Sequence, residues 1–147
     1  SGCASIESFS EMGPYEWSQK VCKNSREAKQ KRLSIIKLKQ RLEPVETEIA
    51  ARRAVLYRGY RIHTQCKNHD CVETPVAIDG DIEEEKLNKY VVLLESMSDR
   101  IRTSEKKYNE DLEVCFSKAE RLSAEQAYNH YKNRTEPKDY AEPLPVY

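Results

Sequence analysis

The fold is decided by residues 66–71, Cys-Lys-Asn-His-Asp-Cys, which lie near the middle of a chain of 147 residues. A second cysteine pair, Cys22 and Cys115, lies far out on either side of this stretch. The residue numbers of each pair add up to 137, and residues of constant sum face each other in an antiparallel hairpin. The sequence therefore predicts a chain folded back between residues 68 and 69, with disulfides Cys66–Cys71 and Cys22–Cys115.

These two disulfides indicate where the protein works. Disulfides persist in oxidising compartments, so the pairing favours the periplasm, the cell surface or secretion over the cytosol. The alternative is a set of reduced thiols that share a sum by accident. A fifth cysteine, Cys3, is left without a partner near the start of the sequence.

Heptads predict two helices that flank the turn. The first is expected from about residue 14 to 56 and the second from about 82 to 133, because apolar residues recur at intervals of seven. The first stripe comprises Ala28, Ile35, Leu42, Ile49 and Leu56, and the second comprises Leu87, Leu94, Ile101, Tyr108, Cys115 and Leu122. Pro44 should kink or split the first helix, since it removes a backbone hydrogen bond. Asp81, with Glu84 three residues later, predicts the start of the second.

Composition agrees with long, exposed helices around a narrow apolar seam. The chain is 34% charged and only 38% hydrophobic, so a deep core is not expected. The predicted fold class is all-α: a long antiparallel helical hairpin, coiled-coil-like, with a disulfide-stapled tip and extended termini. Its domains would be a tether (1–13), the helical hairpin (14–133, with its tip at 57–81) and a Pro-rich tail (134–147).

The tip is rich in arginine and tyrosine, the residue types that are enriched where binding energy concentrates. The candidate partner-binding residues are Arg53, Tyr57, Arg58, Tyr60 and Arg61. The alternative is that this patch pairs internally with nearby carboxylates such as Glu83. Two histidines and two cysteines also lie in the tip, and four such side chains can ligate zinc. That minor alternative involves His63, Cys66, His69 and Cys71, and the disulfide interpretation is preferred to it.

The first residues carry one resemblance to a known class. Ser1-Gly2-Cys3 resembles the end of a bacterial lipobox, the motif whose cysteine is acylated in lipoproteins. The resemblance implies a lipid on Cys3, with residues 4–13 as a tether to the membrane. No signal peptide is visible, so any export signal is expected to have been removed already. The other interpretation of Cys3 is an unpaired or intermolecular thiol.

The sequence predicts a binding protein without catalysis or cofactor. Glycine-rich phosphate loops, serine elbows and zinc-protease motifs are all missing from it. The 25 basic and 25 acidic residues balance, which gives no global electrostatic reason to bind nucleic acid. We expect an envelope protein, periplasmic or anchored to the outer membrane, that binds another envelope or surface protein through its tip or a helix face. A secreted effector or inhibitor is the alternative, and a homodimer through the helix seam stays open.

Overall fold

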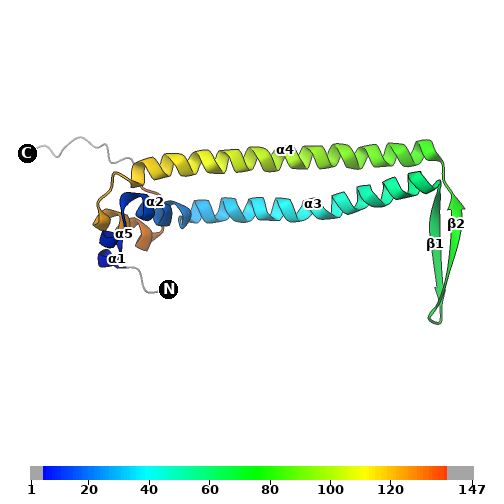
Figure 1. Ribbon diagram of the computed structural model, residues 1–147, viewed down its shortest axis with the longest axis horizontal. Coiled ribbons are helices and arrows are strands. Elements are labelled where there is room, and N and C mark those ends of the chain that lie inside the picture. Colours follow the sequence, from blue (N-terminus) through cyan, green and yellow to red (C-terminus); the bar gives the residue numbers. More distant parts are fainter. Residues whose placement is uncertain (1–4, 139–147) are drawn as a thin grey trace, which may run out of the picture. The chain divides into compact units, whose positions relative to one another are not determined.

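The structure is a computed structural model that describes residues 5–138. Its elements are α1 (Ile6–Glu11), α2 (Pro14–Lys23), α3 (Arg26–Arg58), β1 (Tyr60–Lys67), β2 (Asp70–Ala77), α4 (Gly80–Ala119) and α5 (Ala124–Asn133) (Figure 1). They form two units. We call them the base unit, which contains the described residues of Ser1–Ile36 and Thr103–Tyr147, and the hairpin unit, Lys37–Arg102. Both α3 and α4 contribute residues to each unit.

The all-α prediction is wrong, because the chain contains a sheet. The region expected to be a stapled loop, 57–81, holds the two antiparallel strands β1 and β2. Both predicted disulfides are confirmed: Cys22–Cys115 in the base unit and Cys66–Cys71 between the strands. The cysteine numbering thus located the fold-back correctly, although it did not show that strands form it.

Each expected helix is divided near its outer end. The first consists of α2 and α3, separated at Asn24 and Ser25, and the Ser25 hydroxyl accepts a hydrogen bond from the Ala28 amide at 3.1 Å. Such a hydroxyl at a helix start satisfies an amide that has no partner inside the helix. The second consists of α4 and α5. Pro44 lies inside α3 and does not split it.

Part of the predicted tether is folded. Residues 6–11 form α1, whose start is fixed by a reciprocal pair of hydrogen bonds between Ser5 and Ser8. Phe9 on this helix is completely buried and contacts the rings of Tyr128 and Tyr131 from α5. Cys3 and residues 139–147 of the predicted tail lie outside the described residues.

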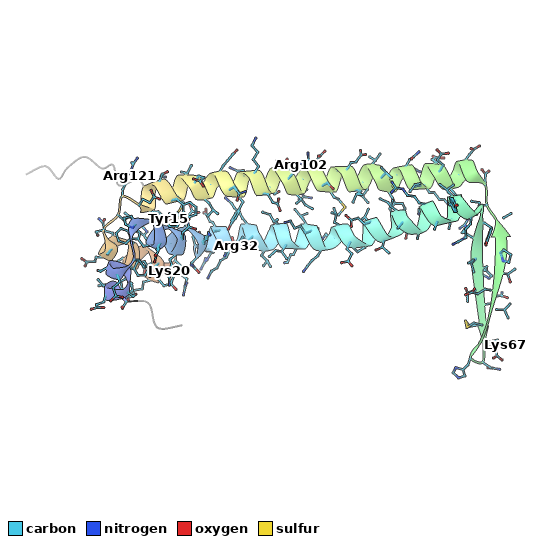
Figure 2. The ribbon with its side chains drawn as sticks, viewed as in Figure 1. Tyr15, Lys20, Arg32, Lys67, Arg102 and Arg121 are labelled. Carbon is cyan, nitrogen blue, oxygen red and sulfur yellow. A yellow bond between two sulfur atoms is a disulfide. The ribbon has the colours of Figure 1, made fainter. Side chains whose placement is uncertain are left out.

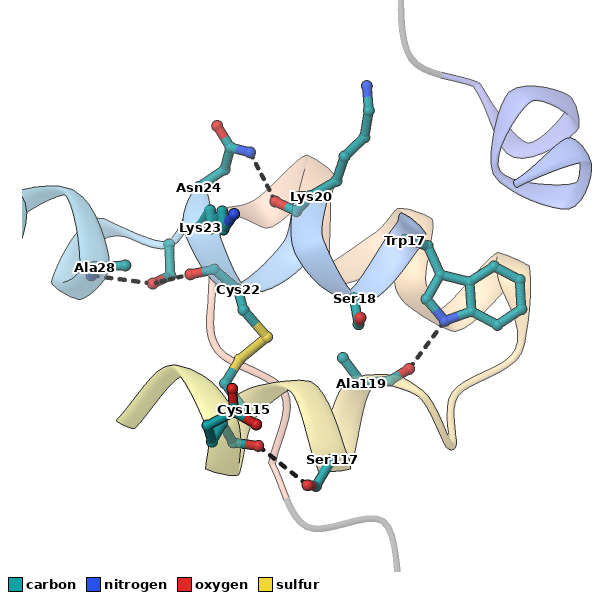
Figure 3. The surroundings of a disulfide bond; sticks show 12 residues. Trp17, Ser18, Lys20, Cys22, Lys23, Asn24, Ala28, Cys115, Ser117 and Ala119 are labelled. Atoms are coloured by element: carbon teal, nitrogen blue, oxygen red, sulfur yellow. Dashed lines mark hydrogen bonds between the residues drawn. A yellow bond between two sulfur atoms is a disulfide. The ribbon is translucent and has the colours of Figure 1, made fainter. Parts of the chain in front are cut away.

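The core of the base unit surrounds the Cys22–Cys115 disulfide, which joins α2 to α4 (Figure 3). Trp17, also on α2, donates its indole N–H to the carbonyl of Ala119 at 3.0 Å. This bond satisfies the polar edge of a ring that is otherwise buried among apolar side chains. The surrounding core residues are Phe9, Val21, Leu122 and Ala127, all at most 3% exposed.

Polar contacts between α3 and α4 surround this core. The Arg32 guanidinium donates to the Tyr108 hydroxyl at 2.8 Å and to the Lys23 carbonyl at the end of α2 at 2.7 Å. Lys31 lies 2.6 Å from Asp111, and their hydrogen bond raises the pKa of Lys31 and lowers the pKa of Asp111. Both of these side chains are more than a third exposed, so the pair adds little stability.

The predicted stripes are buried in part. Ala28, Ile35, Cys115 and Leu122 are buried in the base unit, and Ile49 and Ile101 are buried in the hairpin unit. The remaining stripe residues are half-buried: Leu42, Leu56, Leu87, Leu94 and Tyr108. The stripe read from the sequence is therefore the apolar face of these helices. It is narrow, as the low hydrophobic content indicated.

Replacing Phe9 by alanine should destabilise the base unit by about 3 kcal/mol, because truncating a buried aromatic side chain leaves a cavity. Tyr15→Ala is the matched control, since Tyr15 is 70% exposed on the neighbouring helix and should change stability by less than about 0.5 kcal/mol. Urea unfolding followed by circular dichroism measures both. Equal stability of Phe9→Ala and the wild type would show that α1 does not belong to the folded base unit.

Acid should weaken the base unit through His130. Burial lowers the pKa of His130 below its ordinary value, and a backbone hydrogen bond involving Thr135 only partly opposes this. The unfolded chain therefore takes up the proton first, and stability is lost as the pH falls below about 6.5.

When the pH is lowered from about 7 to about 5.5, the melting temperature of His130→Gln should fall less than that of the wild type. His63→Gln, which alters an exposed histidine of β1, is the control and should follow the wild type. Parallel curves for His130→Gln and the wild type would exclude this histidine as the source of the acid sensitivity.

Candidate interaction site at the β-hairpin

Strands β1 and β2 form a regular hairpin around a two-residue turn. Asn68 and His69 both have positive φ angles, 51° and 70°, as the turn of a tight two-residue hairpin requires. The strands pair Tyr60 with Ala77, Arg61 with Val76, Ile62 with Pro75, His63 with Thr74, Thr64 with Glu73, Gln65 with Val72, Cys66 with Cys71 and Lys67 with Asp70. Every pair adds up to 137, the sum that the four cysteines share.

Both strands are exposed along their entire length. Their apolar side chains have no core to enter: Tyr60 is 39% exposed, Ile62 46%, Val72 64% and Val76 46%. Figure 2 shows the side chains on the two strands, with Lys67 beside the turn. An isolated two-stranded hairpin is marginally stable in water. The Cys66–Cys71 disulfide compensates by joining the strands one rung from the turn.

The junctions between the hairpin and the helices are defined by two short motifs. At the end of α3, Gly59 adopts a φ of 84°, a conformation that glycine reaches without strain, and its amide donates to the Val55 carbonyl. At the start of α4, the Asp79 carboxylate accepts a hydrogen bond from the Asp81 amide at 3.0 Å. The helix cap is therefore Asp79, and the predicted cap at Asp81 is wrong.

A buried carboxylate connects the base of the hairpin to α4. Glu83 is 3% exposed, and its carboxylate lies 2.7 Å from the Arg61 guanidinium of β1 and 3.6 Å from that of Arg52 on α3. Arg52 also lies over the ring of Tyr90, 4.9 Å from its centre. A carboxylate removed from water needs such paired charges. Glu83 thus links α3, β1 and α4 within the hairpin unit.

The structure separates the five candidate partner-binding residues into two groups. Arg53, Tyr57 and Arg58 lie on the last turns of α3, where Tyr57 is 95% exposed. Tyr60 and Arg61 begin β1. The Arg58 guanidinium lies 5.3 Å from the centre of the Tyr60 ring, and Arg61 pairs with Glu83. Internal pairing, the alternative raised from the sequence, therefore occupies Arg61, while Arg53 and Tyr57 stay exposed.

The hairpin gives no support to the zinc alternative. The Cys66–Cys71 disulfide leaves neither sulfur as a thiolate, the form that binds zinc. Among residues 5–138, no group of three or more histidine, cysteine, aspartate or glutamate side chains is arranged to hold a metal ion.

Comparisons with known proteins give no information on this site. No protein-family model, curated protein or solved structure matches this chain. Within the described part of the chain, no helix has the length and apolar character needed to cross a bilayer.

Sequence reasoning missed the apolar residues of this site. Ile62, Val72 and Val76 lie in strands, but neither strand has a buried face that would produce a clear alternation. The turn residues Asn68 and His69 also lack the glycine that usually marks a tight hairpin. The available signal was the equal spacing around residues 68 and 69, and β-branched residues on both sides of it supported strands.

The variant Glu83→Gln should loosen the base of the hairpin, because Arg61 loses its charged partner. We expect faster amide hydrogen exchange at the start of β1 and a loss of about 1–2 kcal/mol in local stability. Glu84→Gln is the control, since this neighbouring carboxylate is exposed. Unchanged exchange in Glu83→Gln would mean that the disulfide alone keeps the strands in place.

Proposed function

We propose that this chain is a non-enzymatic interaction protein of the cell envelope, whose β-hairpin binds another envelope or surface protein. The observation that carries the proposal is the complete exposure of two strands that a disulfide nevertheless holds in register. A segment without a core contributes little to folding stability, so its order suits a role in binding.

The energetics of binding favour such a segment. A partner that binds a flexible loop must also order it, which costs affinity, whereas a covalently closed hairpin is ordered in advance. The exposed side chains Tyr60, Ile62, Val72 and Val76 supply apolar area for a partner to cover. Arg53 and Tyr57, at the adjacent end of α3, add residue types that often dominate binding energy.

The cysteines support the proposed compartment. Two disulfides support an oxidising environment such as the periplasm or the cell exterior. The likeness of Ser1-Gly2-Cys3 to a lipobox supports a lipid on Cys3, which would anchor the protein at a membrane surface. A secreted effector without the lipid would use the same hairpin, and the mass of mature Cys3-containing peptides distinguishes the two.

Photo-crosslinking in the source cells tests the proposal. A photoreactive amino acid at Val72, 64% exposed on β2, should yield a discrete cross-linked product with one partner protein. The matched control is Val114, 57% exposed on α4 in the base unit, where no such product is expected.

The cross-linked product should also disappear in the double variant Cys66→Ser/Cys71→Ser, because the strands lose the disulfide that holds them in register. A product from Val114 together with none from Val72 would contradict hairpin binding and place the interface on the base unit.

A further inference from the structure

The two outer edges of the hairpin differ in their free hydrogen-bonding groups. In an antiparallel pair, residues alternate between rungs that exchange two hydrogen bonds and rungs whose N–H and C=O groups point outward. In a two-residue hairpin the rung next to the turn, Lys67 with Asp70, is of the bonded kind. The next rung, Cys66 with Cys71, is then of the outward kind, in agreement with its short Cα–Cα distance of 4.0 Å.

This alternation assigns the outward groups on each strand. On β1 they belong to Tyr60, Ile62, Thr64 and Cys66, and on β2 to Cys71, Glu73, Pro75 and Ala77. Proline has no N–H, so Pro75 costs the hairpin no internal hydrogen bond at this position. It does deprive the outer edge of β2 of one donor, and its ring obstructs a neighbouring strand. The outer edge of β1 keeps all its donors.

We propose that the outer edge of β1 is the docking edge, and that it binds an extended segment of the partner protein by strand addition. This rests on the proposed function, and it specifies the edge and the kind of segment. Strand addition obtains affinity from backbone hydrogen bonds and specificity from alternate side chains. Within the described residues the sheet has only these two strands, so nothing pairs with β1 on that side.

The side chains of β1 define the chemistry of the segment. One face of the strand carries Tyr60, Ile62 and Thr64. The other face carries His63, Gln65 and Lys67, together with Arg61, whose guanidinium already pairs with Glu83. A strand laid beside β1 places alternate residues on these two faces. The complementary segment therefore alternates apolar or β-branched residues with polar ones, and carries an acidic residue where it lies beside Lys67.

A second copy of this chain fits the edge poorly. When two copies pair antiparallel through this edge, their like faces align, and a register centred on Thr64 places Arg61 of one copy opposite Lys67 of the other. Like charges opposite each other destabilise a sheet. The edge therefore favours an acidic partner segment over self-association.

Two proline variants at facing positions of β1 and β2 distinguish binding at one edge from binding at the other. Thr64→Pro removes an outward N–H from β1 and leaves the internal hydrogen bonds, as Pro75 does on β2. Glu73→Pro makes the same change directly opposite, on the edge that is already obstructed. The probe is a short capped peptide of alternating valine and glutamate, added to the full chain with its disulfides intact.

We expect the peptide to slow amide exchange at Ile62 and Thr64, and not at Glu73. Thr64→Pro should weaken its binding about tenfold, the effect of losing one edge hydrogen bond, while Glu73→Pro should bind as the wild type does. Gln65→Glu is a second variant that keeps the backbone unchanged, and it should also weaken binding by placing a negative charge beside the acidic residues.

The results that would overturn strand addition are specific. Strand addition is wrong if the peptide does not bind, or if the two proline variants weaken its binding equally. It is also wrong if a valine–lysine peptide binds as tightly as the valine–glutamate peptide, or if the chain forms dimers that Thr64→Pro dissociates. If the Val72 cross-link persists in Thr64→Pro, hairpin binding survives and only strand addition fails. If Val72 gives no cross-link, the proposed function itself fails.

Discussion

The Cys22–Cys115 disulfide is the constraint on which the base unit depends. It closes a sequence separation of 93 residues in a chain with few large apolar side chains. Closing a loop of this length removes much of the conformational freedom of the unfolded state, by roughly 4–5 kcal/mol in the chain-entropy description. The aromatic residues Phe9 and Trp17 then pack around the bridge and give the short helices α1 and α5 a core to cover. Without the bridge, three short helices and two helix ends would have to assemble around a very small core.

The position of the fold-back could be predicted because the symmetric spacing of the cysteines and the heptad periodicity are both visible in a single sequence. The heptad residues Ile35, Ile49 and Ile101 are buried as expected, and the cysteine sum gave the register of the strands. Extended back from Ala28 by seven residues, the first stripe reaches Val21 and not Cys22, because Cys22 lies on α2, a helix separate from α3. The break at Asn24 and Ser25 therefore sets the direction in which the Cys22 side chain points. A heptad pattern that is continued across this break cannot predict that direction.

The missed elements are those whose formation depends on contacts distant in sequence. The short helix α1 is ordered by burying Phe9 against Tyr128 and Tyr131, residues from the other end of the described chain. The site was missed for the opposite reason: its strands bury almost nothing, so the hydrophobic pattern carried no information about them. The sequence offered Glu83 as one of several carboxylates that could pair with the arginines, and only the structure shows that Glu83 is buried whereas Glu84 and Glu85 are exposed.

The difference between the two strand edges also limits how these molecules can aggregate. Exposed strands are a hazard, since each open edge can recruit another chain. If two hairpins met through β1, the resulting four-stranded sheet would end on both sides in β2, with a Pro75 at each border. Growth would stop at the pair, because neither border offers a complete row of donors. One proline on β2 thus hinders the addition of further strands, while the edge of β1 stays open.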